Sequence, residues 1–122
     1  MKVLLFAAHG SRKVNSNLEV SLFFEKVLTG LGNKIDRGIC CFLQFGKPGI
    51  EEALEEEIKK GGTKIYIFPY FLFNGAHVTE DLPEIQKKFS AKYPKTEIII
   101  LNSLADAKDF DLFLSKFIGE KI

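Results

Sequence analysis

Four continuous apolar runs alternate with four amphipathic segments along this chain. The runs cover residues 2–8, 38–45, 64–68 and 96–101, and each has the length of a strand. Continuous apolar runs of this length are typical of parallel strands that helices cover on both faces. We therefore expect four buried strands at these positions.

The segments between and after these runs carry apolar side chains at helical spacing. Helices are expected from a cap at Asn15 or Ser16 to residue 31, from Pro48 to residue 58, from Asp81 onward and at residues 110–118. Glycines end the first two of them. Asp81 and Glu84 have the spacing of a capping box, although a turn that begins nearer His77 is also compatible with the sequence.

Strand–helix units that alternate in this way indicate an α/β domain with a parallel sheet and right-handed crossovers. The commonest strand order for so small a sheet is 2-1-3-4, as in flavodoxin-like folds. No linker, low-complexity tract or shift in composition divides the chain. We predict one three-layer αβα domain that spans residues 1–122, with a four-stranded sheet in this order.

Composition argues against several kinds of partner. The 17 Lys and Arg residues nearly balance the 16 Asp and Glu residues, so neither a nucleic-acid groove nor a basic membrane-binding face is indicated.

Cys40 and Cys41 are adjacent within a strand, where neighbouring side chains point to opposite faces, so we expect free thiols. The first apolar run is too short for a signal peptide or a membrane span, which favours a cytoplasmic protein.

The two histidines of the chain occupy equivalent positions after two of the strands. His9 follows the first strand and His77 follows the third. In the order 2-1-3-4 these strands are neighbours, and ligands bind outside their carboxyl ends. A lone histidine is more often a hydrogen-bonding residue than a ligand, but a pair at this edge predicts a metal site. Neutral imidazoles suit Co, Ni, Fe or Zn, and two protein ligands leave coordination positions open.

Other side chains are expected at the same crevice. Glu80 and Asp81 are candidates to orient an imidazole, but Asp81 is more simply explained as negative charge at the N-terminus of a helix. Arg12 is a candidate to bind a carboxylate or a phosphate, and Phe71 to provide a flat apolar wall. No Walker motif is present, so no nucleotide is predicted.

Two stretches around the histidines resemble the signature sequences of a known family. They read Ala8-His9-Gly10-Ser11-Arg12, with Asn15 after it, and Pro69-Tyr-Phe-Leu-Phe-Asn-Gly-Ala-His77-Val-Thr-Glu-Asp81-Leu-Pro83. Both are similar to those of the small single-domain sirohydrochlorin chelatases of the class II chelatase family. The similarity runs from Val3 to about Leu104, so it covers most of the chain.

The resemblance implies a lyase that inserts Co²⁺, Ni²⁺ or Fe²⁺ into sirohydrochlorin without ATP, as in cobalamin biosynthesis. It implies that His9 and His77 are metal ligands and catalytic residues, and that two copies form a homodimer around the tetrapyrrole. Glu80, an acid close to His77 in the sequence, is the expected third catalytic residue. The residues expected to contact the tetrapyrrole are Ser11, Arg12, Gln44, Phe71 and Gly75.

Gln44 departs from the pattern of this family, which usually has an acid at the same position. A neutral amide cannot act as a general base at neutral pH. Two other functions therefore stay open at the level of sequence. One is a non-catalytic carrier of metal or tetrapyrrole, and the other is a small phosphate- or nucleotide-binding module in which His9 is a polar contact.

Overall fold

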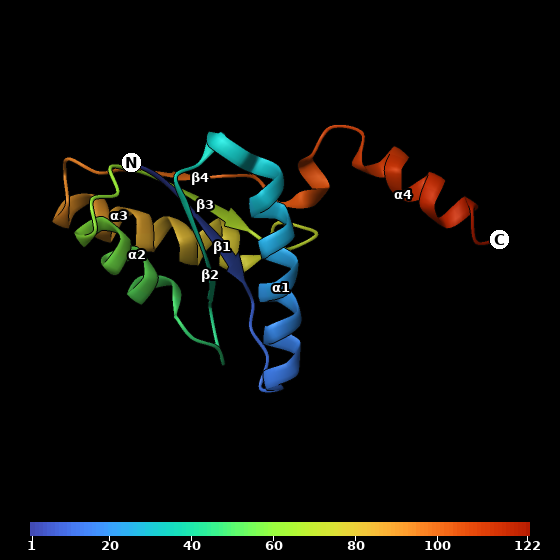
Figure 1. Cartoon of the computed structure of the whole chain (residues 1–122), viewed down its shortest axis with the longest axis horizontal. Helices are drawn as coiled ribbons and strands as arrows, with labels where there is room; N and C mark the ends of the chain where they lie inside the picture. The colour runs from blue at the N-terminus through green and yellow to red at the C-terminus, as the bar shows by residue number, and fades with distance from the viewer.

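The sheet has the predicted strand order. The computed structural model describes residues 1–122, and its four parallel strands lie in the order β2-β1-β3-β4 (Figure 1). The strands are β1 (Lys2–Ala8), β2 (Arg37–Phe42), β3 (Lys64–Pro69) and β4 (Glu97–Ile100). In the register, Ala7 of β1 pairs with Cys41 of β2 and with Pro69 of β3, so the carboxyl ends of the three strands reach the same edge.

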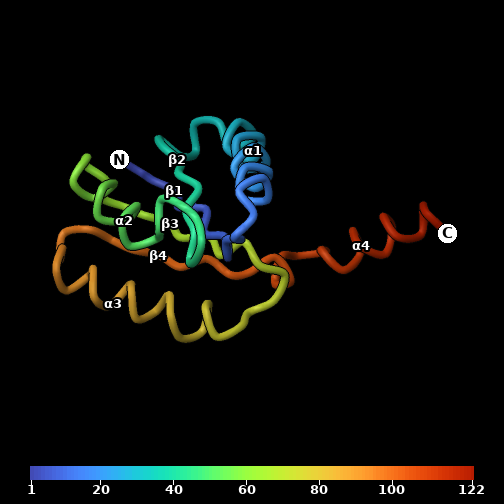
Figure 2. Tube along the Cα trace, turned by 90° about the horizontal axis from the view of Figure 1, so that it is seen from below, coloured from blue at the N-terminus to red at the C-terminus, as the bar shows by residue number.

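Helices cover both faces of the sheet, as a three-layer αβα domain requires (Figure 2). One face packs against α1 (Val14–Leu31), and the other packs against α2 (Ile50–Lys59) and α3 (Leu82–Lys92). Three short helical turns complete the chain: η1 (Gly32–Lys34), η2 (His77–Asp81) and η3 (Leu104–Asp106).

Alternate side chains of the strands form two separate apolar layers. Val3, Leu5 and Ala7 belong to the larger cluster, which α2 and α3 cover. Leu4 and Phe6 belong to the smaller cluster, which α1 covers. A parallel sheet buried on both faces needs apolar residues at every position, which explains why the strands read as continuous apolar runs.

The bounds of several elements differ from the prediction. The strand expected at residues 38–45 ends at Phe42, where the chain enters a series of bends over residues 43–48. The first helix begins at Val14 with Lys13 at its N-cap position, so the predicted cap at Asn15 or Ser16 is wrong and both residues lie inside the helix. The Asp81 side chain accepts no hydrogen bond from a backbone N–H of α3. The predicted capping box is therefore wrong.

The last helix, α4 (Phe110–Gly119), lies apart from the three layers. Both views show α4 extending away from the sheet, with the C-terminus at its far end (Figures 1 and 2). Every residue from 111 to 122 is exposed. The helix itself was predicted from its apolar spacing, but it covers no part of the sheet in its own chain.

The structure also describes the two cysteines and the apolar character of the helices. Cys40 and Cys41 are both free thiols, as predicted, and Cys41 is fully buried. None of the helices combines the length and the apolar character that a membrane span would need.

Candidate metal centre

The structure brings the two histidines together. The centroids of the His9 and His77 imidazole rings lie 5.1 Å apart, with an angle of 55° between the ring planes. His9 is the first residue after β1, and His77 begins η2 beyond the end of β3. The backbone N–H of Tyr70 donates to the carbonyl of Ala7 at 2.8 Å, which extends the β1–β3 pairing up to the site. The predicted contact between the ends of strands one and three is therefore present.

His77 lies in a wide helical turn rather than in a regular α-helix. In η2 the N–H of Leu82 donates to the carbonyl of His77, five residues earlier, which is the bonding pattern of a π-helix. The carbonyl of Gly75 accepts bonds from the N–H groups of both Val78 and Thr79, each at 3.0 Å. Single π turns of this kind are found often at functional sites.

Asp81 orients the His77 ring. Nδ1 of His77 lies 2.6 Å from Oδ2 of Asp81, one helical turn further along. When Nδ1 carries the proton and donates it to the carboxylate, the lone pair of Nε2 is free to bind a metal ion. Asp81 is the N-cap residue of α3, as expected for helix-terminal charge, and its carboxylate also contacts the imidazole.

The histidines line a small hollow with aromatic walls. The hollow has a volume of about 170 Å³. Phe71 lies nearly parallel to the His77 ring, with 6.2 Å between centroids and 21° between planes, and it meets His9 edge-on at 6.3 Å. The lining residues are His9, Phe71, Phe73, Gly75, His77 and Val78. Phe71 and Gly75, which were predicted to contact a tetrapyrrole, thus lie beside both imidazoles.

Glu80 differs from Asp81 in its surroundings. Its side chain is exposed on η2 and takes part in no hydrogen bond or ion pair within the chain. A catalytic role for Glu80 therefore stays a prediction. The acid that contacts a site histidine in this structure is Asp81.

Gln44 lies beside His9 through its backbone. The N–H of Gln44 donates to the carbonyl of His9 at 2.9 Å, and its side chain is exposed. Gly10 makes this approach possible: it has a φ of +95°, and a Cβ atom there would lie 1.7 Å from the Gln44 carbonyl oxygen. Only glycine fits this position. The tetrapyrrole-binding role of Gln44 stays a prediction.

Ser11 and Arg12 lie in the loop that follows His9, and neither of them lines the hollow. The N–H of Ser11 donates to the side-chain carbonyl of Asn17 at 2.8 Å, and the Asn17 amide donates in turn to the carbonyls of Ser11 and Phe45. Arg12 lies over the ring of Phe45, with 4.7 Å from its guanidinium carbon to the ring centroid. Asn17 therefore ties together the two loops that follow β1 and β2.

The role of Asn17 in joining the two loops was not predicted from the sequence. The only available signal was an amide on the side of a helix that begins next to the loop, and many surface positions share that signal. Side-chain bonds to loops are decided by the local approach of the chains rather than by residue spacing.

Two imidazoles form the potential ligand set. The chain contains no group of three or more His, Cys, Asp or Glu side chains that are placed to hold a metal ion. A resident structural ion usually has four protein ligands. The arrangement here suits an ion that keeps most of its coordination positions open for other donors.

The sheet order and the histidine pair at the carboxyl ends of β1 and β3 define a domain of the class II chelatase fold. The CbiX family model matches residues 3–120, and the chain belongs to the CbiX family. The resemblance that the two signature stretches indicated is therefore confirmed.

Individual relatives agree with this assignment. The chain is 33% identical over 99 residues to a sirohydrochlorin ferrochelatase of Priestia megaterium, covering 81% of this chain and 36% of that protein. It is 29% identical over 123 residues to a sirohydrochlorin cobaltochelatase of Saccharolobus islandicus, covering 96% of this chain and 93% of that protein.

Among solved structures, the chain is similar to SirB from Bacillus subtilis with Fe³⁺. The TM-score is 0.74 and the sequence identity is 27%, and the match covers 84% of this chain and 40% of that one. The chain thus spans 36% of the length of the Priestia protein and 40% of the length of the Bacillus protein.

Proposed function

We propose that this chain is a sirohydrochlorin chelatase, which inserts a divalent ion into the tetrapyrrole without ATP. The observation that carries the proposal is the facing pair of His9 and His77, whose ring centroids lie 5.1 Å apart at the switch point of the sheet. Membership of the CbiX family and the names of the relatives support it. The candidate ions are Co²⁺, Ni²⁺ and Fe²⁺, all of which accept imidazole ligands.

The ion is a substrate in this proposal, and the two imidazoles deliver it. When Nδ1 of His77 carries the proton, it donates a hydrogen bond to the Asp81 carboxylate, and Nε2 is available as a ligand. With two protein ligands, the ion retains positions at which pyrrole nitrogens can replace water. The imidazoles are then released one after the other as the ion enters the macrocycle.

The surroundings of the histidines match the two chemical parts of a tetrapyrrole. Phe71 and Phe73 provide flat apolar surface next to the imidazoles for the ring. Arg12, held over Phe45 in the loop after His9, is the cation proposed for the peripheral carboxylates of sirohydrochlorin. Apolar surface beside the imidazoles and a nearby cation support the proposal, because a macrocycle with acidic substituents presents both kinds of surface.

Insertion releases two protons, because two pyrrole N–H bonds break as the nitrogens bind the ion. A neutral imidazole can accept one of these protons once the ion has left it. Gln44 has no proton-accepting group that works at neutral pH, so Glu80 and water are the other candidate acceptors.

A homodimer is part of this proposal. The hollow of one chain holds only about 170 Å³, which is too small to enclose a macrocycle. Leu72 and Phe73 are exposed beside it, Phe73 to 74%, so apolar surface is available for a second copy to cover.

The test is an insertion assay with sirohydrochlorin and Co²⁺, followed by the visible spectrum. We expect the wild type to accelerate the spectral change, and the His9→Ala/His77→Ala variant to abolish the acceleration. Lys88→Ala is the control, because Lys88 pairs with Glu51 at the surface between α2 and α3, away from the site. A wild type without any acceleration over the buffer contradicts the proposal.

A second function is favoured by one observation, the neutral Gln44 at a position where a base is expected. A carrier would bind both the metal and the tetrapyrrole without joining them. Equilibrium binding of each ligand, together with an unchanged insertion rate, would identify the chain as a carrier.

A further inference from the structure

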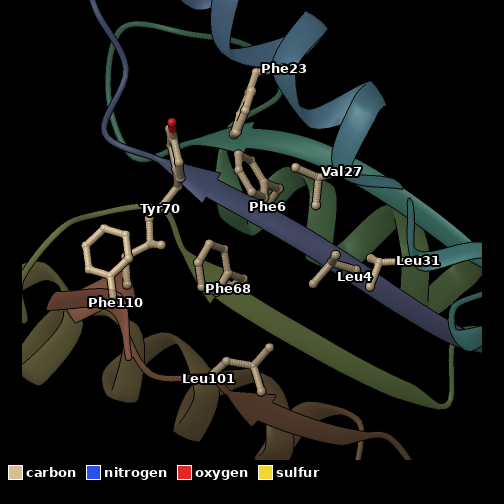
Figure 3. Close-up of a pocket in the computed structure, with 10 residues that line it drawn as sticks. Leu4, Phe6, Phe23, Val27, Leu31, Phe68, Tyr70, Leu101 and Phe110 are labelled. Carbon is tan, nitrogen blue, oxygen red and sulfur yellow. The ribbon is translucent and has the colours of Figure 1, made fainter. Parts of the chain in front are cut away.

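An apolar groove lies open on the face of the sheet that α1 covers in part. The groove has a volume of about 470 Å³, and it contains no charged side chain (Figure 3). Phe23, Val27 and Leu31 of α1 line one side, and Leu101 and Phe110 line the opposite side. The remaining lining residues are Leu4, Phe6, Phe68, Tyr70 and Leu104.

The groove is open because one helix cannot cover four strands. α1 packs on the half of this face that β1 and β2 form. The alternation along β3 points Phe68 to this same face, whereas Ile65 and Ile67 point to the other one, under α2 and α3. In a parallel sheet both faces are normally covered, so the β3–β4 half of this face lacks a helix.

α4 carries an apolar stripe that, beyond Phe110, has no partner in its own chain. The stripe recurs at helical spacing and consists of Phe110, Phe113, Leu114, Phe117 and Ile118. Phe113, Phe117 and Ile118 are 59%, 52% and 54% exposed. Ser115, two residues before Phe117, lies on the other side of the helix from that ring. An amphipathic helix of this kind is stable in water only when its apolar side is packed.

The connection to α4 directs the helix away from its own groove. Leu104 and Ala105 of η3 donate to the carbonyls of Phe71 and Leu72, at 3.1 and 2.7 Å. Asp106 accepts a bond from the side chain of Asn74 at 3.0 Å. η3 is thus anchored to the loop after β3, and only Phe110, the first residue of α4, reaches the groove before the helix departs (Figure 2).

We propose that α4 is exchanged between two copies of this chain, so that each helix fills the apolar groove of the other copy. The groove lacks one helix and α4 lacks one apolar partner, and both surfaces are free of charge where they would meet. Exchange of identical elements is a common route to closed dimers. The second copy is the occupant with the matching surface, whereas a carboxylate-rich tetrapyrrole would find no cation in this groove.

The area is sufficient for a stable dimer. Each aromatic side chain can bury about 150–250 Å². The stripe residues are roughly half exposed, so two exchanged helices in two grooves would bury on the order of 1,500 Å². Interfaces of this size are typical of specific protein pairs.

The exchange would also place the second copy beside the metal centre. η3 is hydrogen-bonded to Phe71, which contacts both imidazoles. Tyr70, the residue before Phe71 in the sequence, lines the groove. This inference rests on the proposed function in one respect, namely that two copies of the chain form a homodimer. It does not depend on the reaction.

A cross-linking experiment on the full chain distinguishes exchange from folding back. Val27→Cys places a thiol in the groove, and Phe117→Cys places one on the stripe of α4. In the double variant, a short bis-maleimide should join two chains and give a covalent dimer on a denaturing gel. A cross-link within one chain, which leaves a monomer, would overturn the proposal.

Two matched controls accompany the cross-linking. Val27→Cys/Ser115→Cys places the second thiol on the opposite side of α4, and it should cross-link at least tenfold more slowly. The wild type reports any reaction of the native thiols. Burial raises the pKa of the Cys41 thiol, which disfavours the reactive thiolate.

A charge on the stripe provides a second test, by light scattering. The wild type should have twice the chain mass of 13.8 kDa. Phe117→Asp should weaken dimerisation at least 100-fold, because the carboxylate would have to enter an apolar groove, whereas Ser115→Asp should leave the dimer unchanged. Neither change can unfold the domain, since residues 111–122 are exposed in their own chain.

The outcomes separate the exchange from the homodimer itself and from the reaction. A dimer that survives Phe117→Asp and does not cross-link through position 117 would retain the homodimer but overturn the exchange. A monomeric wild type at micromolar concentration would overturn both. Chelatase activity is measured independently of either result, in the insertion assay described above.

Discussion

Oδ2 of Asp81 lies 2.6 Å from Nδ1 of His77, so the acid that contacts a site imidazole is Asp81 and not its neighbour Glu80. The π turn brings residues 77 and 81 to the same side of the chain and leaves Glu80 exposed. This relationship leads to the first prediction.

Asp81→Asn should lower the affinity for Co²⁺ by about 10–100-fold, as is typical when the partner of a metal-binding histidine is changed. An amide in place of the carboxylate stabilises the required tautomer less strongly. Isothermal titration with Co²⁺ measures the change. Glu80→Gln removes the same charge one residue away and should alter the affinity less than threefold. Equal effects of the two variants would show that Co²⁺ affinity falls because a negative charge is removed, and not because the His77 imidazole loses its orientation.

Both histidines should contribute to the same metal site. His9→Ala and His77→Ala should each reduce Co²⁺ affinity at least tenfold, and the double variant should not bind much more weakly than either single one, because one imidazole alone holds the ion poorly. Titration at a series of pH values should also show weaker binding in acid, since a protonated imidazole has no lone pair for the metal. A single variant with unchanged affinity would remove that histidine from the site.

Gln44→Glu should raise the rate of insertion, because it supplies a proton acceptor next to His9. General-base assistance is typically worth about 10²–10⁴-fold, and a residue introduced without its natural surroundings should give the lower end of this range. The initial rate of the spectral change measures the effect. Gln44→Met, similar in size but without a base, is the control. No gain with glutamate would mean that proton removal does not limit the rate.

Gly10→Ala should destabilise the turn that holds His9. Its Cβ would meet the Gln44 carbonyl oxygen, in addition to the strain of a φ of +95°. Gly61→Ala is a matched control, since Gly61 has a φ of +105° but nothing within 4 Å of the added atom. Urea unfolding should show a loss of about 1–2 kcal/mol for Gly61→Ala, from backbone strain alone. The loss for Gly10→Ala should be clearly larger, and metal affinity should fall with it. Equal losses would contradict the close approach.

Much of the fold follows from local pattern and general rules. Strand-length apolar runs that alternate with amphipathic segments predicted a parallel sheet, and the strand order was confirmed because small sheets of this kind adopt few topologies. That order brings His9 and His77 to one edge even though they are distant in the sequence. The pairing of these two residues could therefore be predicted without coordinates.

Other parts of the site depend on how chains approach in space. Asp81 and Glu84 fit a capping box by spacing, but the Asp81 carboxylate contacts His77 and makes no bond to a backbone N–H of α3. Asn17 joins the loops after β1 and β2 through three hydrogen bonds, and its position in a helix gave no sign of this. Side-chain hydrogen bonds of this kind depend on distances of a few ångströms, which residue spacing does not determine.

By itself, the sequence determined the type of each element, the order of the strands, and the meeting of His9 and His77 at one edge of the sheet, because these depend on periodicity and on the rules of parallel sheets. It also determined that α4 has an apolar side. Only the tertiary structure decided where that side points. The same stripe from Phe110 to Ile118 would suit a helix packed on its own sheet, and the anchoring of η3 to Phe71 and Leu72 directs α4 away from it. The physical reason is that an amphipathic pattern specifies only that one side of a helix must be buried. Contacts between residues distant in the sequence decide which surface that side packs against.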